Sequence, residues 1–196
     1  VASASASDTA AGTGARTIRL TYMTGTGAGP FTEDITLNGV TFVATVATNI
    51  QFIEKIEVLT AGSGGVNAGV ISLFVNNTGG GGTIGTIGVG TLLAAVGDNT
   101  TLWAHHYVPL GRVASLSTIV ASATAAASAA NATFFIRSHA HVAGAVDRLL
   151  SDVLLITQAF TRQLSFPIQV TGPAHLTLYG IPAANNETLA GSFDFI

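Results

Sequence analysis

The pair Asn38-Gly39, in the middle of residues 31–46 (FTEDITLNGVTFVATV), is the sequence feature that most constrains the fold. A two-residue type I′ hairpin turn needs φ > 0 at both central positions, and Asn and Gly tolerate this best. A slip of one residue would turn the apolar side chains to water, so the pattern predicts a core hairpin with a well-defined register. The expected cross-strand pairs are Leu37–Val40, Ile35–Phe42 and Phe31–Val46, with the polar face made by Thr32, Asp34, Thr36, Thr41 and Thr45.

Alternating apolar and polar residues separated by turn signals continue along the chain. In residues 16–23, Ile18, Leu20 and Tyr22 alternate with polar residues, which is typical of a half-buried strand. Further strands are expected at 50–59, 70–75, 83–93, 101–108, 113–122, 132–141, 152–158, 162–170, 175–180 and 191–196. About a dozen short strands with almost no helical periodicity predict an all-β protein, a jelly-roll-type antiparallel β-sandwich.

The first 15 residues differ in composition from the rest. Residues 1–15, VASASASDTAAGTGA, are small and low in complexity. They predict an extended, flexible N-terminal arm that becomes ordered only against a partner. No linker divides residues 16–196, so a single sandwich domain is expected there. Residues 1–15 lack the basic start and apolar core of a signal peptide, and the long uncharged stretches 58–97 and 113–136 are too rich in small and polar residues to predict a membrane span.

Composition excludes several classes of function. A net charge of −3 and a pI of about 5.9 provide no basic field for nucleic acid or an anionic membrane. Cysteine is absent, which excludes disulfides and thiolate metal sites. Charged residues make up only 9% of the chain, against roughly 25% in ordinary soluble domains. Either other subunits cover much of the surface, or the surface is a neutral Ser/Thr-rich one that is simply soluble.

His139-Ala-His141 is the best candidate for a metal site. Residues two apart on a strand share a face and could bind one ion, as in cupin-like jelly rolls. A cupin would also need a following glutamate and a later histidine. The next acids are Asp147 and Asp152, and His175 lacks the expected surroundings. We therefore expect no metal and no cofactor, and the alternative is that these are polar histidines at a strand end near a subunit boundary.

No motif predicts catalysis. His105 and His106 are adjacent and should point to opposite faces of a strand, and so should Glu33 and Asp34. No serine lies in a GxSxG elbow, and the glycine-rich residues 79–90 lack the pattern of a phosphate-binding loop. Arg137, Arg148 and Arg162 are scattered and favour interface hydrogen bonds over a basic patch. The chain is thus predicted not to be an enzyme, although sugar binding through Trp103, Tyr107 and Tyr179 stays an alternative.

Three segments resemble a known family: RTIRLTY at 16–22, TEDITLNGVT at 32–41 and IEKIEVLTAGSGG at 53–65. They look like small jelly-roll virion proteins of tailed bacteriophages, which occur as capsid decoration or cement proteins and related accessory structural proteins. The resemblance is best over residues 16–75. It weakens afterwards to a strand near Trp103, a Pro-Leu-Gly-Arg turn at 109–112 and a C-terminal FDFI.

The resemblance implies a non-enzymatic cement or decoration protein that forms a homotrimer and stabilises an icosahedral capsid. The implied partner is the major capsid protein, and the implied location is the capsid exterior of a virion assembled in the bacterial cytoplasm. No direct contact with nucleic acid or with a membrane is expected. The alternative within virions is a tail, collar or fibre component that binds a receptor or a carbohydrate.

Overall fold

The computed structural model describes residues 1–24, 29–74, 93–94, 96–101, 104–125, 132–142, 148–150, 154–156, 159–182 and 187–196. Strands are the regular secondary structure of this part, so the predicted all-β class is confirmed. None of the described residues forms a helix long and apolar enough to cross a membrane. The chain divides into two compact units, Val1–Trp103 (unit 1) and Ala104–Ile196 (unit 2). This division differs from the expected single domain over residues 16–196. The expected strand at 83–93 lies mostly outside the described residues.

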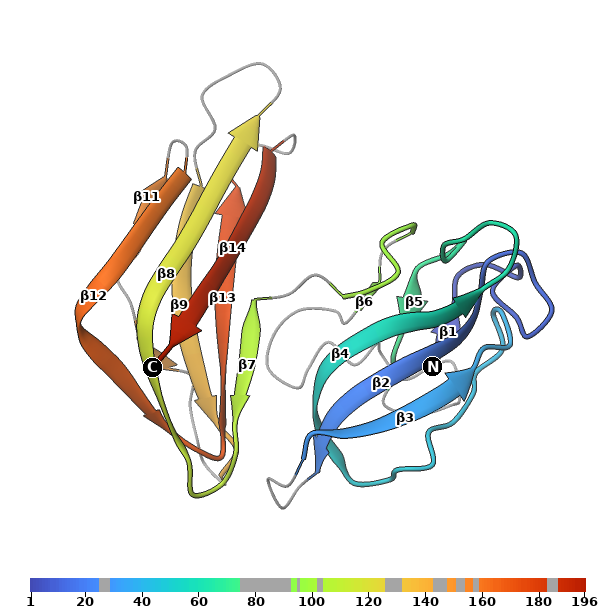
Figure 1. Ribbon diagram of the computed structural model, residues 1–196, viewed down its shortest axis with the longest axis horizontal. Helices are drawn as coiled ribbons and strands as arrows, with labels where there is room; N and C mark the ends of the chain where they lie inside the picture. Colours follow the sequence, from blue (N-terminus) through green and yellow to red (C-terminus); the bar gives the residue numbers. More distant parts are fainter. Residues whose placement is uncertain are drawn as a thin grey trace. The chain divides into compact units, whose positions relative to one another are not determined.

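Unit 1 is built on an antiparallel sheet of β2 (Ala15–Thr24), β3 (Phe31–Thr36) and β4 (Ile50–Ala61), with β2 in the centre (Figure 1). A second, small sheet is made by β1 (Ala2–Ser3), β5 (Ile71–Ser72) and β6 (Leu93–Ala94). The register of β2 shifts at several points along β4. No shift separates the pairs Tyr22–Ile53 and Met23–Phe52, so Ile53 and Phe52 take opposite faces of the sheet. Both are buried, and Ile53 belongs to the core of unit 1.

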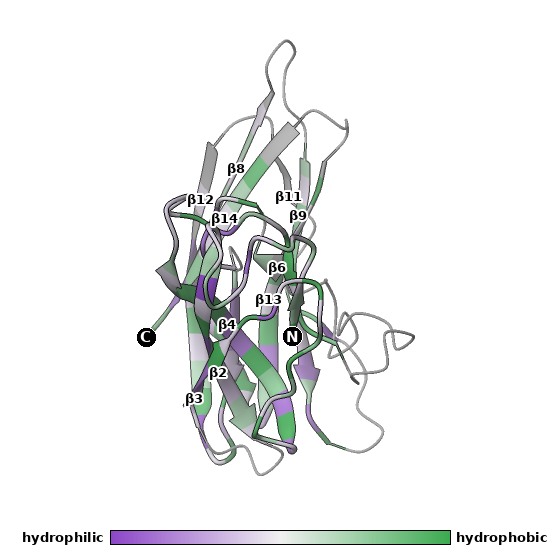
Figure 2. Cartoon of the chain, turned by 90° about the vertical axis from the view of Figure 1, so that its right-hand side faces the viewer, coloured by the Kyte–Doolittle hydropathy of each residue, from purple (hydrophilic) through white to green (hydrophobic). Residues whose placement is uncertain are grey.

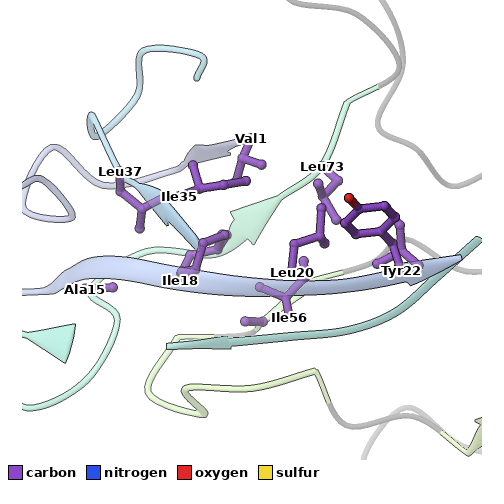
Figure 3. Packing of buried hydrophobic residues seen from close by; sticks show 12 residues of the cluster. Val1, Ala15, Ile18, Leu20, Tyr22, Ile35, Leu37, Ile56 and Leu73 are labelled. Atoms are coloured by element: carbon purple, nitrogen blue, oxygen red, sulfur yellow. The ribbon is translucent and has the colours of Figure 1, made fainter. Parts of the chain in front are cut away.

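The core of unit 1 is formed by apolar side chains of β2 together with apolar side chains from the rest of its own sheet and from the small β1-β5-β6 sheet. Ile18 and Leu20 are fully buried, as the alternation predicts, and Tyr22 is nearly so. Figure 3 shows these residues on one side of β2, with Ile35, Leu37 and Leu73 around them. Each such side chain contributes about 1.5–3 kcal/mol when it leaves water. The remaining buried members are Val1, Ala15, Ile53, Ile56, Ile71 and Ala94.

The opposite face of the β3-β2-β4 sheet is polar. Arg19 lies in register between Asp34 of β3 and Glu57 of β4. Its guanidinium donates two hydrogen bonds to the Asp34 carboxylate, at 2.7 and 2.9 Å. Threonines flank this ion pair, with Thr17 opposite Thr36 and Thr21 opposite Thr32. Polar and apolar residues are interspersed along β4 in Figure 2, as a strand with one wet face requires.

The predicted hairpin at residues 31–46 is correct for β3 and wrong for its second half. Ile35 and Leu37 are buried, but Val40 and Val46 are exposed to 61% and 87%. The bridge at the turn pairs Asn38 with Thr41, and Gly39 alone among the turn residues has a positive φ, of 58°. The turn is therefore shifted by one residue, and residues 40–49 form no second hairpin strand.

Hydrogen bonds to the N-terminal residues explain this shift. The amide of Ser3 donates to the carbonyl of Gly39, and the amide of Gly39 donates to the carbonyl of Asp8. Val1 and Val43 exchange two further bonds, of 2.7 and 2.9 Å. The second half of the expected hairpin thus pairs with the first residues of the chain, while β3 pairs with β2.

Residues 1–15 are part of the folded unit, which corrects the prediction of a flexible arm. Val1 is 7% exposed, and Asp8 is fully buried. The Asp8 carboxylate accepts hydrogen bonds from the amides of Ala15, Ala68 and Gly69 at 2.6, 2.9 and 2.9 Å, and from the Ser3 hydroxyl at 2.5 Å. A buried carboxylate must be satisfied in this way. The backbone amides that donate to Asp8 come from distant parts of unit 1. Hydrogen bonds to Asp8 therefore hold residues 1–15 in place, which apolar burial alone would not do.

Unit 2 consists of two antiparallel sheets. One sheet has the order β10-β9-β13-β7, with β11 also pairing β9, and the other has the order β12-β8-β14, with β8 between its neighbours (Figure 1). The strands are β7 (His105–Val108), β8 (Val113–Ala125), β9 (Ala132–Ala140), β10 (Arg148–Leu149), β11 (Leu154–Ile156), β12 (Ala159–Thr171), β13 (Ala174–Pro182) and β14 (Glu187–Phe195).

Both sheets of unit 2 contribute to one core. Ile136 and Leu176 from the first sheet are packed with Leu116 and Ile119 from the second, all fully buried or nearly so. Alternate residues of β9 and β13 therefore face this core, and the residues between them face outward. Seven strands predicted in this half are confirmed within a few residues, while β10 was not predicted.

Candidate functional site

The outward face of the β9-β13-β7 sheet carries a cluster of three histidines and a tyrosine, which we call the histidine cluster: His139, His141, His175 and Tyr107. Tyr107, His175 and His139 lie in register across β7, β13 and β9. His141 follows His139 by two residues, and its amide donates to the carbonyl of Pro173 at 2.8 Å. The alternation of strand side chains and the antiparallel register thus bring four ring side chains to one face.

The rings are in direct contact. Their centroids are 5.5 Å apart for His139 and His141, 5.4 Å for His139 and His175, and 5.0 Å for His141 and His175. The Nδ1 atom of His175 and the Nε2 atom of His141 share a hydrogen bond of 2.9 Å. The ring of Tyr107 lies 5.4 Å from that of His141. Each of the three histidines contacts the other two, so the cluster acts as a unit.

Burial changes the acid–base properties of the cluster. Desolvation, and secondly the charge of His139, lower the pKa of His141 from 6.5 to about 4. Burial also raises the pKa of Tyr107 above its usual value of 10. At neutral pH His141 is therefore an uncharged imidazole, the form that accepts a hydrogen bond or binds a metal.

The sequence reasoning placed His139 and His141 together correctly but excluded His175. Strand alternation is a local property, whereas the pairing of His175 with His139 depends on the β9–β13 register. In the described ranges no group of three or more His, Cys, Asp or Glu residues is placed to hold a metal ion. The two facing nitrogens of His141 and His175 are instead hydrogen-bonded to each other.

The remaining histidines separate as expected. His106 follows His105 on β7 and contacts Phe195, with ring centroids 4.7 Å apart. Its register partner is Leu176, which faces the core, so His106 points away from the histidine cluster. Adjacent strand residues take opposite faces, which explains the difference.

The acidic pair Glu33 and Asp34 has structural contacts. Glu33 accepts hydrogen bonds from the amides of Val46 and Ala47, at 2.7 and 3.2 Å. Asp34 pairs with Arg19, whose hydrogen bond lowers the pKa of that carboxyl. The two carboxylates serve different partners, as expected for adjacent strand residues that point in opposite directions.

Of the aromatic residues considered for sugar binding, Tyr107 and Tyr179 are described, and their surroundings differ. Tyr107 is only 1% exposed, so its ring face is not available at the surface. Tyr179 stacks on Phe135 at 5.2 Å, and Arg137 lies over both rings, at 5.0 and 5.6 Å from their centroids. Arg137 thus makes cation–π contacts, which the sequence did not predict. Trp103 and the side chain of Arg162 lie outside the described residues.

Fold and site together define an all-β protein of several antiparallel sheets with a histidine cluster on the outward face of one of them. Comparison with protein-family models, with curated proteins and with solved structures found no match to this chain.

Proposed function

We propose that this chain is a non-enzymatic virion structural protein, a decoration or cement protein that binds the outer surface of an icosahedral phage capsid. In this proposal it binds the major capsid protein, forms trimers and stabilises the shell. The two antiparallel sheets of unit 2 are proposed to form a sandwich of the jelly-roll type. The resemblance of residues 16–75 to this family motivates the proposal.

The observation that carries the proposal is a surface poor in charge that exposes many large apolar side chains. Charged residues are 9% of the chain. Among the described residues, Phe166 is 88% exposed, Val46 87% and Ile196 82%. Single exposed apolar residues are ordinary, but a large set of them on a weakly charged surface favours burial against other subunits. The other exposed members of this set are Phe31, Val40, Leu59, Val66, Val96, Leu110, Val113, Val142, Leu149 and Ile181.

Phe166 illustrates the point. It lies on β12, at the edge of the β12-β8-β14 sheet, where the register shifts between Gln163 and Ile168. Such a bulge redirects side chains away from the sheet and blunts an edge strand. An aromatic ring displayed on an edge bulge is suited to insertion into a neighbouring subunit, where an aromatic anchor contributes much of the binding free energy.

The polar face of the β3-β2-β4 sheet is proposed as a second contact with a neighbouring subunit. Its exposed Thr32 and Thr36 are neutral, and its main charged pair, Arg19 with Asp34, is internally compensated. A chain with Thr32→Lys and Thr36→Lys should fold like the wild type and bind capsids more weakly. The matched control places lysines at Ala10 and Ala11, which are exposed in the same unit.

The test of the proposed function is localisation and binding. Purified protein is added to expanded and unexpanded heads of the phage that encodes it, and cryo-electron microscopy of the heads shows where it binds. Trimers in light scattering and density on the outer face of expanded heads support the proposal. A monomer that binds no head overturns it.

One observation favours the alternative of a receptor- or carbohydrate-binding tail component. The stacked pair Phe135 and Tyr179 presents aromatic surface on β9 and β13, and sugars bind to such surfaces. Arg137 covers part of the same rings. Specific glycan binding that is lost in Tyr179→Ala, together with tail localisation in virions, would select this alternative over the capsid role.

A further inference from the structure

We infer that Asn38-Gly39 is a site of spontaneous backbone modification, and that residues 1–9 protect it for as long as they are docked on unit 1. The reaction is formation of a succinimide at Asn38, followed by hydrolysis to aspartate or isoaspartate. It needs no enzyme and no cofactor, since water is the only co-reactant. The inference does not depend on the proposed capsid role.

The sequence supplies the reactive pair. The backbone nitrogen of the residue that follows an asparagine can attack the asparagine side-chain amide, and a side chain on that following residue hinders the attack. Glycine has no side chain and adopts a wide range of backbone conformations, so asparagine is most prone to this reaction when glycine follows it. No other asparagine in the sequence is followed by glycine.

The two residues of the pair differ in exposure. Asn38 is exposed and therefore open to water, whereas Gly39 is buried. N-terminal residues lie against Gly39, because a Cβ added there would lie 3.2 Å from the Cα atom of Ala6 and 3.3 Å from Cγ2 of Thr9. A β-bridge also pairs Thr9 with Asn38. The reactive pair is thus held directly against the N-terminal segment.

The attacking nitrogen is occupied by a hydrogen bond. The amide of Gly39 donates to the carbonyl of Asp8 at 2.7 Å, and the carbonyl of Gly39 accepts from the amide of Ser3 at 2.9 Å. To attack Asn38, the Gly39 nitrogen must lose its proton and approach the Cγ atom of Asn38. Both steps require the bond to Asp8 to break, so the docked segment prevents the reaction.

Once residues 1–9 detach, the reaction can proceed. A bond forms between the Gly39 nitrogen and Cγ of Asn38, and the bond from Cγ to Nδ2 breaks. The side-chain nitrogen leaves as ammonia, which takes up the proton that the Gly39 amide gives up. Water then opens the cyclic imide: cleavage between nitrogen and Cγ gives aspartate, and cleavage between nitrogen and the main-chain carbonyl carbon gives isoaspartate.

Isoaspartate would weaken the docking of the N-terminal segment permanently. Its main chain runs through the side chain and contains an extra carbon atom between the amides of Leu37 and Gly39. These amides donate to Arg16 and Asp8, at 2.9 and 2.7 Å. The longer main chain cannot keep both bonds in their present geometry. A single opening of the segment can therefore leave a lasting chemical change.

The test compares modification of Asn38 with opening of the N-terminal segment in the full chain. Peptide mass spectrometry after incubation at mildly alkaline pH measures the modification, and hydrogen exchange of the Gly39 amide measures the opening. The folded wild type should be modified at least about 100-fold more slowly than the chain unfolded in urea. Opening is fast relative to ring closure, so both rates should follow the population of the open form.

Two variants loosen the anchor of the segment. Ser3→Ala removes the hydroxyl that donates to the Asp8 carboxylate at 2.5 Å. It should raise Gly39 exchange and Asn38 modification by the same factor, about tenfold, while the β2 and β4 amides stay protected and show that unit 1 is folded. Asp8→Ala gives the same comparison with the whole carboxylate removed. Ser63→Ala, at an exposed serine of unit 1, is the matched control and should change neither rate.

Asn38→Gln identifies the product, because the longer side chain would have to close a larger ring and should yield almost none. The inference is overturned if the folded wild type is modified as fast as the unfolded chain, or if Asn38 is modified no faster than Asn67 in urea. It is also overturned if either loosened variant raises Gly39 exchange without raising modification, or if neither variant raises either rate.

Discussion

The Oδ1 atom of Asp8 lies 2.6 Å from the backbone nitrogen of Ala15, at the point where the N-terminal segment enters the central strand β2. The same carboxylate accepts bonds from Ala68 and Gly69, about sixty residues further along the chain. A single buried acid therefore joins three segments of unit 1.

Replacing Asp8 should destabilise unit 1 strongly. In Asp8→Ala the amides of Ala15, Ala68 and Gly69 lose their acceptor, and each buried unsatisfied amide is costly. We expect a loss of about 3 kcal/mol in the free energy of unfolding, measured by urea denaturation. Asp98→Asn, at an exposed acid in the same unit, is the control and should change little. Equal stability of the two variants would show that the carboxylate is not the anchor.

Gly14→Ala should act on the same anchor. A Cβ at this position would lie 2.0 Å from Oδ1 of Asp8, so the carboxylate has to move. We expect a loss of about 1–3 kcal/mol, as for other overpacked sites. In the double variant with Asp8→Ala the clash with the carboxylate is gone. The combined loss should therefore be smaller than the sum of the two single losses, and strict additivity in the cycle would contradict the coupling.

Deleting residues 1–15 should unfold or strongly destabilise unit 1. The deletion removes β1, the buried Val1 and the Asp8 anchor, all of which contact the remainder of the unit. A flexible arm would instead be dispensable for the fold. Hydrogen exchange of the β2 and β4 amides measures the effect. Ala10→Ser with Ala11→Ser, at exposed positions of the same segment, should leave exchange unchanged.

The stability of unit 2 should fall as the pH drops from 6.5 towards 4. The pKa of His141 is lowered to about 4 in the folded state. Between these pH values the unfolded chain therefore binds more protons, and folding loses free energy. Since the ring is partly exposed, we expect about 1–2 kcal/mol and not the full value of the shift.

Thermal unfolding at pH 7 and at about pH 4.5 measures this effect, because the second pH lies between the folded and unfolded pKa values of His141. The neighbouring titratable groups are His139, His175 and Tyr107. In His141→Gln the pH dependence should be smaller than in the wild type. An unchanged dependence would mean that another group is responsible.

Phe166→Ser should weaken association without affecting the fold. The side chain is 88% exposed, so its loss leaves the core of unit 2 intact. Wild-type thermal stability together with weaker trimers or weaker capsid binding is expected, as measured by light scattering and co-sedimentation. Leu164→Ser is the contrasting variant, because Leu164 packs against the core and its replacement should lower stability. Unaltered association of Phe166→Ser would exclude this ring from an interface.

Local patterns in the sequence predicted most of the strands and the composition of their faces. The alternation of Ile18, Leu20 and Tyr22 correctly indicated which side of β2 is buried. The spacing of His139 and His141 correctly placed both on one face. Such predictions succeed because side-chain direction along a strand depends only on adjacent residues.

The order of residues along the chain is enough to specify the all-β class, the separation of polar and apolar faces and the scarcity of charge. The pairing of segments that are distant in the sequence is determined only by tertiary packing within each unit. Packing placed the N-terminal residues beside residues 38–43, although the hairpin pattern predicted that β3 would pair there. Packing also buried Asp8 and brought His175 beside His139 and His141. These outcomes depend on competition among backbone partners far apart in the chain, and local propensity does not resolve that competition.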